Sequence, residues 1–305
     1  MNFTYNNHLS YTIGGREFGY RQEPHEKYNV TCGQADPVVY KQSSWYNELL
    51  RTADCVLSEF GKDLVIFLSG GTDSEIVLRN FLEIGHTPRC VTIKFKDDYN
   101  LPDVLEAQTI AKELGVNLEI IEFDVKDFYW SGEASEFAQD IDCTQITYLT
   151  VYYHIKKLGM PSIMGGEQLL RRHVGLEGSY WYHCFRENED ASAMRFSNKF
   201  QIPLVNEWFS YTPEMMLYYL EDPAIQDLVN NRFNYKITSV SSKNEILKRL
   251  YPSIRVKVKT HGFERLLGFN LESYNNLKRD VITRKSSSLD GIPVKELIKH
   301  LRKKL

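Results

Sequence analysis

The sequence predicts an α/β fold built on a doubly wound parallel sheet, and two patterns carry this prediction. Short apolar runs alternate with amphipathic segments of helical period between residues 45 and 164. The run 64–68 holds five consecutive apolar residues, which is typical of a parallel strand buried on both faces. Strands that alternate with helices form right-handed crossovers, which place helices on both faces of one sheet. A length of 305 residues, 42% of them hydrophobic and 25% charged, fits a globular chain.

The elements follow in order along three predicted regions. Residues 1–42 alternate apolar and polar side chains and are predicted to form a small β appendage, a hairpin or meander. Residues 43–200 are predicted to form the main α/β domain, in which Ser43 or Ser44 caps a first helix that ends at Gly61. Strands are expected at 64–68, 91–95, 118–123 and 162–164, and helices at 73–84, 102–114 and 144–158.

Residues 201–305 lose this alternation and are predicted to be helical. Helix caps are expected at Thr212-Pro213 and Ser241-Ser242. We expect no buried strand there, and we expect this portion to pack on the sheet and complete the active site.

Composition excludes several classes of protein. No apolar run approaches the ~20 residues that a membrane-spanning helix needs. The N-terminus lacks the basic and apolar regions of a secretory signal. The five cysteines form no Cys-x-x-Cys pair, which favours reduced thiols. We therefore expect a cytoplasmic protein.

Charge is distributed unevenly. Residues 251–305 hold 13 Lys and Arg against 5 Asp and Glu, a net charge of +8, whereas the first 250 residues carry −11. A basic quarter of this kind makes a nucleic acid a possible partner. The alternative interpretation of the last ten residues is a solvated helix face with a frayed end.

The most informative segment is Leu68-Ser69-Gly70-Gly71-Thr72-Asp73-Ser74, between a predicted strand and a predicted helix. The two glycines allow a sharp turn and a close approach to a ligand. The helix that follows offers unpaired N–H groups and the positive end of its dipole, beside the hydroxyls of Ser69, Thr72 and Ser74. This combination predicts a phosphate cradle; the alternative is a plain strand-to-helix turn. The segment lacks the Gly-x4-Gly-Lys pattern of the mononucleotide-kinase loop.

Ser69-Gly70-Gly71-Thr72-Asp73-Ser74 resembles the signature of the PP-loop ATP pyrophosphatases, which have the adenine nucleotide α hydrolase-like fold. The likeness extends loosely over residues 45–270 to the synthetase domain of asparagine synthetases and β-lactam synthetases. The further segments that carry it are 103–115, Met164-Gly165-Gly166-Glu167, 242–249 and 252–263.

This resemblance implies ATP and Mg²⁺ as cofactors and assigns roles to individual residues. Ser69, Gly70, Gly71 and Ser74 would hold the pyrophosphate, and Asp73 the metal. Leu68, Ile93 and Gly165 fall where the family holds adenosine. Glu167 falls at an acid/base position, and Lys259 at the position of the lysine that stabilises the transition state, with Lys257 as the alternate.

The chain departs from the family pattern at two places. Gln168-Leu169-Leu170 follows Glu167 where the family has a second acidic pair, so either Glu167 itself reaches the metal or only Asp73 does. Residue 2 is Asn, and about 60 residues precede the loop, so we expect no glutaminase within this chain. The expected partners are therefore a small carboxylate or amide substrate and ammonia or an amine, with a separate glutaminase as a possible ammonia source.

The resemblance predicts a ligase that adenylates a carboxylate or amide oxygen and transfers the product to ammonia or an amine, with release of AMP and pyrophosphate. Two alternatives stay open. One is a PP-loop enzyme that modifies a nucleic acid base or a deazaguanine precursor, and the other is a catalytically silent nucleotide-binding protein.

Residues 168–185 hold weaker candidates. His173, His183 and Cys184 lack the spacing of a metal site and are interpreted as scattered polar positions. The aromatic block 180–185 is predicted either to wall the acceptor pocket or to pack in the core. Arg171-Arg172 is interpreted either as contacting an anionic substrate or as a solvated helix face.

Overall fold

The computed structural model contains a five-stranded parallel sheet at its centre, with the strand order β10-β7-β4-β5-β6. The residues that the structure describes are 10–13, 16–19, 30–32, 43–141, 143, 146–166, 169–175, 178–184, 187–230, 239–255, 262–266 and 292–302. The strands are β4 (Val65–Phe67), β5 (Arg89–Phe95), β6 (Leu118–Phe123), β7 (Ser162–Ile163) and β10 (Leu204–Val205). The predicted doubly wound α/β fold is therefore confirmed.

The first strand of the sheet, β4, lies in its middle. The chain adds β5 and β6 on one side of β4 and then returns to add β7 and β10 on the other. The direction of winding thus reverses between β4 and β7. In open parallel sheets, ligands bind at such a reversal, outside the carboxyl ends of the strands.

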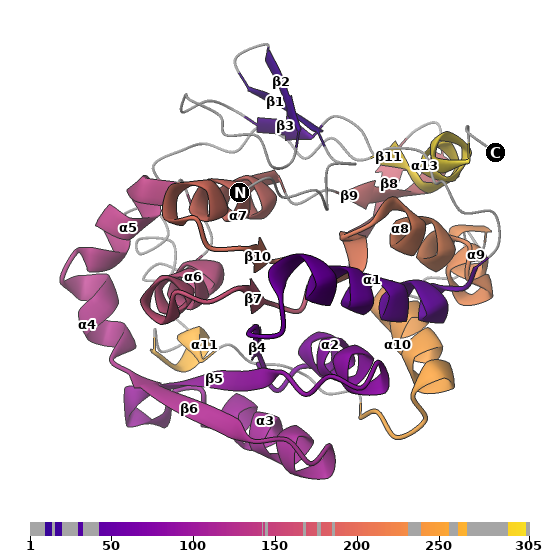
Figure 1. Cartoon of the computed structure of the whole chain (residues 1–305). Helices are drawn as coiled ribbons and strands as arrows, with labels where there is room; N and C mark the ends of the chain where they lie inside the picture. Colours follow the sequence, from indigo (N-terminus) through magenta and orange to yellow (C-terminus); the bar gives the residue numbers. More distant parts are fainter. Residues whose placement is uncertain are drawn as a thin grey trace.

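Alternate residues of β4 and its flanks supply two separate cores, as expected from the two-residue period of a strand. Leu64, Ile66 and Leu68 pack in one core together with side chains of α1, α2, α3, α8, α9 and α10. Val65 and Phe67 pack in the other with α4, α5, α6 and α7. The two groups of helices cover opposite faces of the sheet (Figure 1).

The helices of the first core begin and end largely where sequence signals predict. They are α1 (Trp45–Phe60), α2 (Thr72–Glu83), α3 (Leu101–Glu113), α8 (Pro213–Leu220), α9 (Pro223–Asn230) and α10 (Ser239–Leu250). Ser44 caps α1 by accepting a hydrogen bond from the Asn47 N–H, and Thr212 caps α8 in the same way through Met215. Helix α10, however, begins at Ser239, two residues before the predicted cap.

The remaining helices are α4 (Val125–Trp130), α5 (Glu133–Ile141), α6 (Ile146–Leu158), α7 (Glu187–Phe200), α11 (Phe263–Leu266) and α13 (Val294–Leu301). None of the helices among the described residues is long and apolar enough to span a membrane.

Two predictions about strands are wrong. Beyond residue 200 we expected no buried strand, but Leu204 and Val205 form β10, are buried, and pair with β7. Residues 169–175 and 178–184 form an antiparallel pair, β8 (Leu169–Gly175) and β9 (Gly178–Cys184). Arg171-Arg172 therefore lies on a strand, which overturns its interpretation as a helix face.

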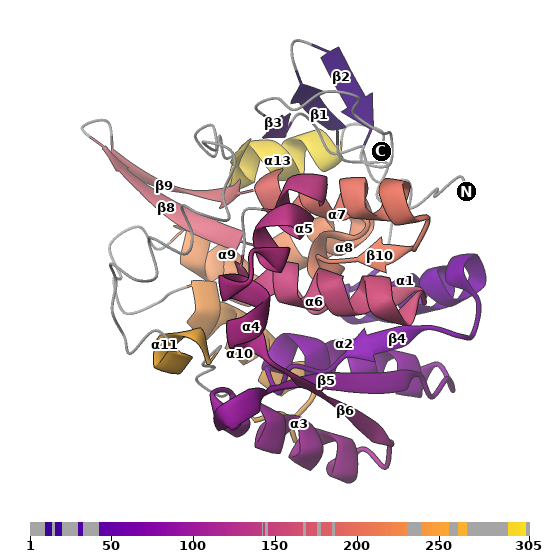
Figure 2. The ribbon, with the colours of Figure 1, turned by 90° about the vertical axis from the view of Figure 1, so that its left-hand side faces the viewer.

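Two small antiparallel sheets lie outside the central one. Near the N-terminus, β1 (Ser10–Ile13), β2 (Arg16–Gly19) and β3 (Val30–Cys32) pair in the order β2-β1-β3, in agreement with the predicted hairpin. The strand β11 (Ile292–Pro293) pairs with β9. Helix α13 comes next in the sequence and contacts both strands. Figure 2 shows the β8–β9 pair extending past the helices, with α13 next to its base.

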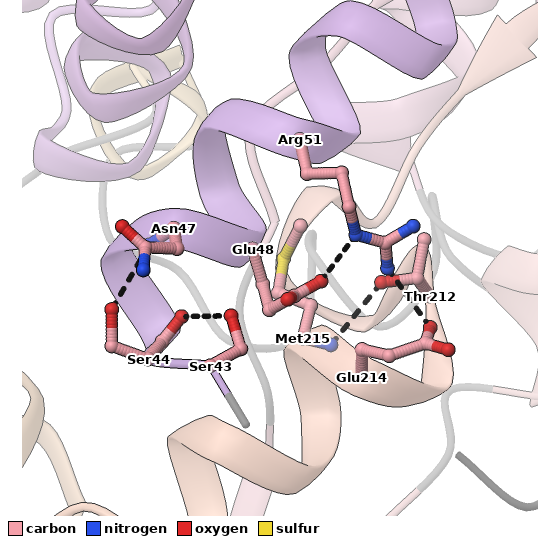
Figure 3. Close-up of polar contacts among 8 residues, drawn as sticks. All are labelled: Ser43, Ser44, Asn47, Glu48, Arg51, Thr212, Glu214 and Met215. Atoms are coloured by element: carbon pink, nitrogen blue, oxygen red, sulfur yellow. Dashed lines mark hydrogen bonds and ion pairs between the residues drawn. The ribbon is translucent and has the colours of Figure 1, made fainter. Parts of the chain in front are cut away.

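Polar contacts join α1 to α8 across the first core (Figure 3). The Arg51 Nε donates to Glu48 Oε2 at 2.6 Å, and its Nη2 lies 3.1 Å from Glu214 Oε2. Both carboxylates are buried, at 2% and 5% exposure. The C-terminal portion is thus fixed to the first helix of the α/β domain.

Candidate functional site

A cavity of about 400 Å³ opens at the carboxyl ends of the central strands, where the direction of winding reverses. Its walls come from the residues that follow β4, β5 and β7, from the first turns of α2 and α3, and from α6. Its lining residues include Phe67, Leu68, Ser69, Gly71, Asp73, Ser74, Val91, Ile93, Phe95, Asn100, Asp103, Tyr148, Met164, Gly165, Gly166 and Phe263.

The turn between β4 and α2 is held in place by its own side chains. The Ser74 hydroxyl donates to the Gly71 carbonyl at 3.0 Å and accepts from the Ser69 N–H at 3.1 Å. Its oxygen also lies 3.1 Å from the Ser69 hydroxyl. Gly71 stands at the N-cap of α2 and has no side chain to cap the helix. The first N–H groups of α2 therefore face the cavity mouth as donors, an arrangement that favours an anion.

Gly70 has a positive φ of 72°, and its position admits no larger residue. A Cβ atom at Gly70 would overlap the carbonyl oxygen of Asp103 in the first turn of α3. The turn is thus pressed against α3, so that Asp103 reaches the same cavity as the loop.

The segment after β7 closes the opposite wall. A Cβ atom at Gly165 would lie 2.9 Å from the Ser74 nitrogen, so only glycine permits this approach to the start of α2. Two glycine-containing turns from neighbouring strands thus meet at one end of the cavity.

The other end of the cavity is largely apolar. Phe67, Val91, Phe95 and Phe263 line it, with the Phe95 and Phe263 rings packed edge to face at 5.4 Å. Asn100 fixes the end of β5, because its side chain accepts from the Phe95 N–H at 2.7 Å and donates to the Ile93 carbonyl at 2.8 Å. Apolar and aromatic lining of this kind suits an aromatic base.

Two carboxylates, Asp73 and Asp103, reach the cavity from α2 and α3. Magnesium in proteins is commonly bound through one or two carboxylates together with the phosphates of a nucleotide. The donor set beside the loop therefore fits Mg²⁺. Asp73 also accepts a hydrogen bond from Lys243 Nζ on α10, at 2.8 Å.

A hydrogen-bonded pair, one member half-buried and the other buried, lies at the third side of the cavity. The Tyr148 hydroxyl on α6 donates to Glu207 Oε1 at 2.9 Å. Glu207 follows β10 and is 3% exposed. A Cβ atom at Gly166 would lie 2.5 Å from Glu207 Oε2, so the chain passes directly against this carboxylate.

Most of the described residues among the predicted site residues lie at this one cavity. Seven of them line the cavity: Leu68, Ser69, Gly71, Asp73, Ser74, Ile93 and Gly165. Gly70 lies where the loop packs against α3, and Thr72 is the first residue of α2. Glu167, Lys257 and Lys259 lie outside the described residues, so their roles stay predictions.

Sequence reasoning missed four residues, Asp103, Tyr148, Glu207 and Lys243. Asp103 and Lys243 lie inside segments that carried the family resemblance, which was a usable signal. Glu207 follows a two-residue strand that no periodicity reveals.

The described cysteines and metal-binding side chains give no second site. Cys55, Cys90 and Cys143 are not joined in disulfides, and burial raises the pKa of Cys90 to about 12. Among the described residues, no group of three or more His, Cys, Asp or Glu side chains is placed to hold a metal ion.

Two solved structures are similar to this chain at low sequence identity. No protein-family model matches the chain. No curated protein matches it either. A solved structure described as a predicted subunit of tRNA methyltransferase from Methanocaldococcus jannaschii is 16% identical, with a TM-score of 0.33 over 62% of this chain and 87% of that one. The NMN synthetase from Francisella tularensis is 12% identical, with a TM-score of 0.31 over 80% of this chain and 98% of that one. TM-scores this low say nothing about activity. The fold assignment rests on the strand order and the direction of winding in the sheet.

Proposed function

We propose that this chain is a PP-loop enzyme that uses ATP to adenylate a carboxylate or amide oxygen and passes the activated group to ammonia or an amine. One observation carries the proposal. The loop 69–74, the open N-terminus of α2 and the glycines after β7 surround one cavity at the reversal of the sheet.

The cavity suits the two halves of ATP. Its apolar end, between the ends of β4 and β5, would take the adenine ring, and the loop with the α2 N–H groups would take the phosphates. Gly70 lets the loop pack against α3, and Gly165 lets the segment after β7 pack against the start of α2, which keeps the loop at the cavity.

Asp73 would hold Mg²⁺, and Asp103, which lines the same cavity, would offer a second carboxylate. The ion would neutralise charge that develops on the leaving pyrophosphate. The sequence left two alternatives for the metal ligands: Glu167 together with Asp73, or Asp73 alone. Asp103 would be a further acidic ligand.

The residues of the chain would orient an in-line attack. A substrate oxygen attacks the α-phosphorus, the bond to the bridging oxygen breaks, and pyrophosphate leaves with that electron pair. An amine then displaces AMP from the activated carbon. Tyr148, oriented by Glu207, would offer its hydroxyl to the second substrate at the third side of the cavity. Glu167 and Lys259, or Lys257, keep their predicted acid/base and charge-stabilising roles.

The products of turnover test this proposal. We expect pyrophosphate release in a screen of carboxylic acids, each combined with ammonium or an amine, and phosphorus NMR should show AMP and pyrophosphate in equal amounts. Accumulation of ADP and inorganic phosphate would contradict the proposed chemistry. Tight ATP binding without turnover on any substrate would favour the catalytically silent alternative.

A nucleic acid acceptor is the second candidate. It is favoured by the net charge of +8 over residues 251–305 and by α13, from that basic quarter, lying beside β9. Retention of labelled tRNA on a filter should then fall steeply with salt, because phosphate contacts release counterions. Retention that is weak at low salt would exclude this acceptor.

A further inference from the structure

Lys243 on α10 reaches across the molecule to the carboxylate that the proposed function assigns to the metal. Its Nζ atom lies 2.8 Å from Asp73 Oδ1. The Lys243 side chain is 8% exposed, whereas that of Asp73 is 30% exposed and lines the cavity. The ammonium thus approaches Asp73 from the protein side and leaves the cavity side of the carboxylate open.

The helix that carries Lys243 is firmly placed. Ile246 and Leu247 of α10 are fully buried in the first core. At the end of α10, the Tyr251 hydroxyl donates to Asn80 Oδ1 of α2 at 2.7 Å. The backbone of Lys243 is therefore held at a fixed place within reach of Asp73, while its side chain can turn.

A divalent cation and this ammonium compete for the same oxygens. Mg²⁺ requires close contact with its ligands, at about 2.0–2.1 Å, and gives up its water reluctantly. An ammonium beside the ligand repels the incoming ion and neutralises the negative charge that would attract it. A triphosphate changes this balance, because its oxygens offer the ammonium other anionic partners. The lysine side chain is flexible enough to turn from Asp73 to the phosphate oxygens.

We infer that Lys243 is a gate on the metal site: it occupies Asp73 while the nucleotide is absent and releases it when phosphates enter. The divalent cation therefore binds with the nucleotide rather than before it. This inference rests on the proposed function, since it needs a nucleotide in the cavity and a metal on Asp73.

The test measures metal binding without nucleotide. Free Mn²⁺ is followed by electron paramagnetic resonance during titration of the full-length chain and of Lys243→Met. We expect Lys243→Met to bind Mn²⁺ at least tenfold more tightly than the unaltered chain. Lys243→Arg, which keeps the positive charge, should bind as weakly as the unaltered chain.

Lys96→Met is the matched control for the change in net charge. Lys96, after β5, pairs with Asp124, after β6, at 2.9 Å in an exposed pair that does not line the cavity. We expect this variant to leave Mn²⁺ affinity unchanged. Equal Mn²⁺ affinity in the unaltered chain and Lys243→Met, including no detectable binding to either, would overturn the gate.

A second titration separates the gate from the proposed function. ATP binding to the unaltered chain is measured by calorimetry, once with EDTA and once with Mn²⁺. Binding in both conditions, tighter with Mn²⁺, is expected. A chain that binds no ATP would contradict the proposed function, whereas ATP binding with unchanged metal affinity in Lys243→Met would contradict only the gate. Thermal unfolding of each variant confirms that it is folded.

Discussion

Gly70 shows how strongly one residue of the loop is constrained by its surroundings. Its φ of 72° suits glycine, and its α-carbon faces the backbone of α3 without room for a methyl group. Gly115 distinguishes the effect of the positive φ from that of the close contact. It has a similar φ of 69°, but a Cβ atom there would have no other atom within 4 Å.

Gly70→Ala should weaken ATP binding strongly, because the loop must shift away from Asp103 to accept the methyl group. Gly115→Ala should show only the cost of left-handed backbone, about 1–2 kcal/mol of stability, with ATP affinity retained. Calorimetric titration with ATP and urea unfolding of both variants provide the comparison. Equal losses of stability and unchanged ATP affinity in both would show that the contact with α3 is unimportant.

Asp73→Asn should reduce turnover by more than tenfold, equivalent to over about 1.4 kcal/mol of barrier. An amide keeps the size of the side chain but loses the charge that holds a divalent cation. Since Asp73 is partly exposed and outside the core, the thermal unfolding temperature should change little. The decisive measurement is kcat with saturating Mg²⁺ and ATP; activity within tenfold of the unaltered chain would remove Asp73 from the metal site.

Local sequence was sufficient to predict the loop but not its partners. Ser69, Gly71 and Ser74 lie within six residues, and their hydrogen bonds close within that span. Lys243 is 170 residues from Asp73, so its contact depends on how α10 packs against α2. The same reason explains why the pairing of Tyr148 with Glu207, 59 residues apart, was not foreseen.

The elements were predictable where a period or a cap extends over enough residues. The alternation along residues 64–68 divides the side chains between two cores as predicted, and α1 begins after Ser44. The strand β10 escaped prediction because two residues show no period. The strands β8 and β9 also escaped prediction, because their sequences show no regular alternation of apolar residues. Basic and aromatic residues pair across them instead, as Arg171 does with Tyr182.

Between elements, the contact of α1 with α8 makes a further prediction. Arg51→Met should lower the free energy of unfolding by about 2 kcal/mol, because Glu48 and Glu214 would keep buried negative charge without their guanidinium. The control is Arg255→Met, since Arg255 and Glu113 form an exposed pair with both side chains 48% exposed. That variant should lose less than about 1 kcal/mol. Urea denaturation of both gives the difference, and equal losses would mean that burial of the two carboxylates is unimportant.

For the whole molecule, His154 predicts a dependence of stability on pH. Burial lowers its pKa from 6.5 to about 4, and the side chain is 4% exposed between Phe123 and Tyr153. Between these two values the unfolded chain binds the proton and the folded chain does not, so acid favours unfolding.

The free energy of unfolding should therefore fall by about 1.4 kcal/mol per pH unit below pH 6.5 through this residue. His154→Phe keeps an aromatic ring at the site and lacks the proton. Its stability should thus decline less than that of the unaltered chain between pH 6.5 and 5, by about 2 kcal/mol. Urea unfolding across this range compares the two, and parallel curves would contradict the prediction.

The order of the strands has a consequence for how the chain matures on the ribosome. The central strand β4 gains β5 by residue 95, but β7 follows only at residues 162–163 and β10 at 204–205. A nascent chain that has emerged only to residue 200 would hold β7 with one edge bare and would lack Trp208 and Phe209, which are buried in the first core. The wall that Gly165 presents to α2 would then lack its support from β10. We expect the loop 69–74 to acquire its final shape late in synthesis, and a fragment ending at residue 200 to need a chaperone to stay monomeric.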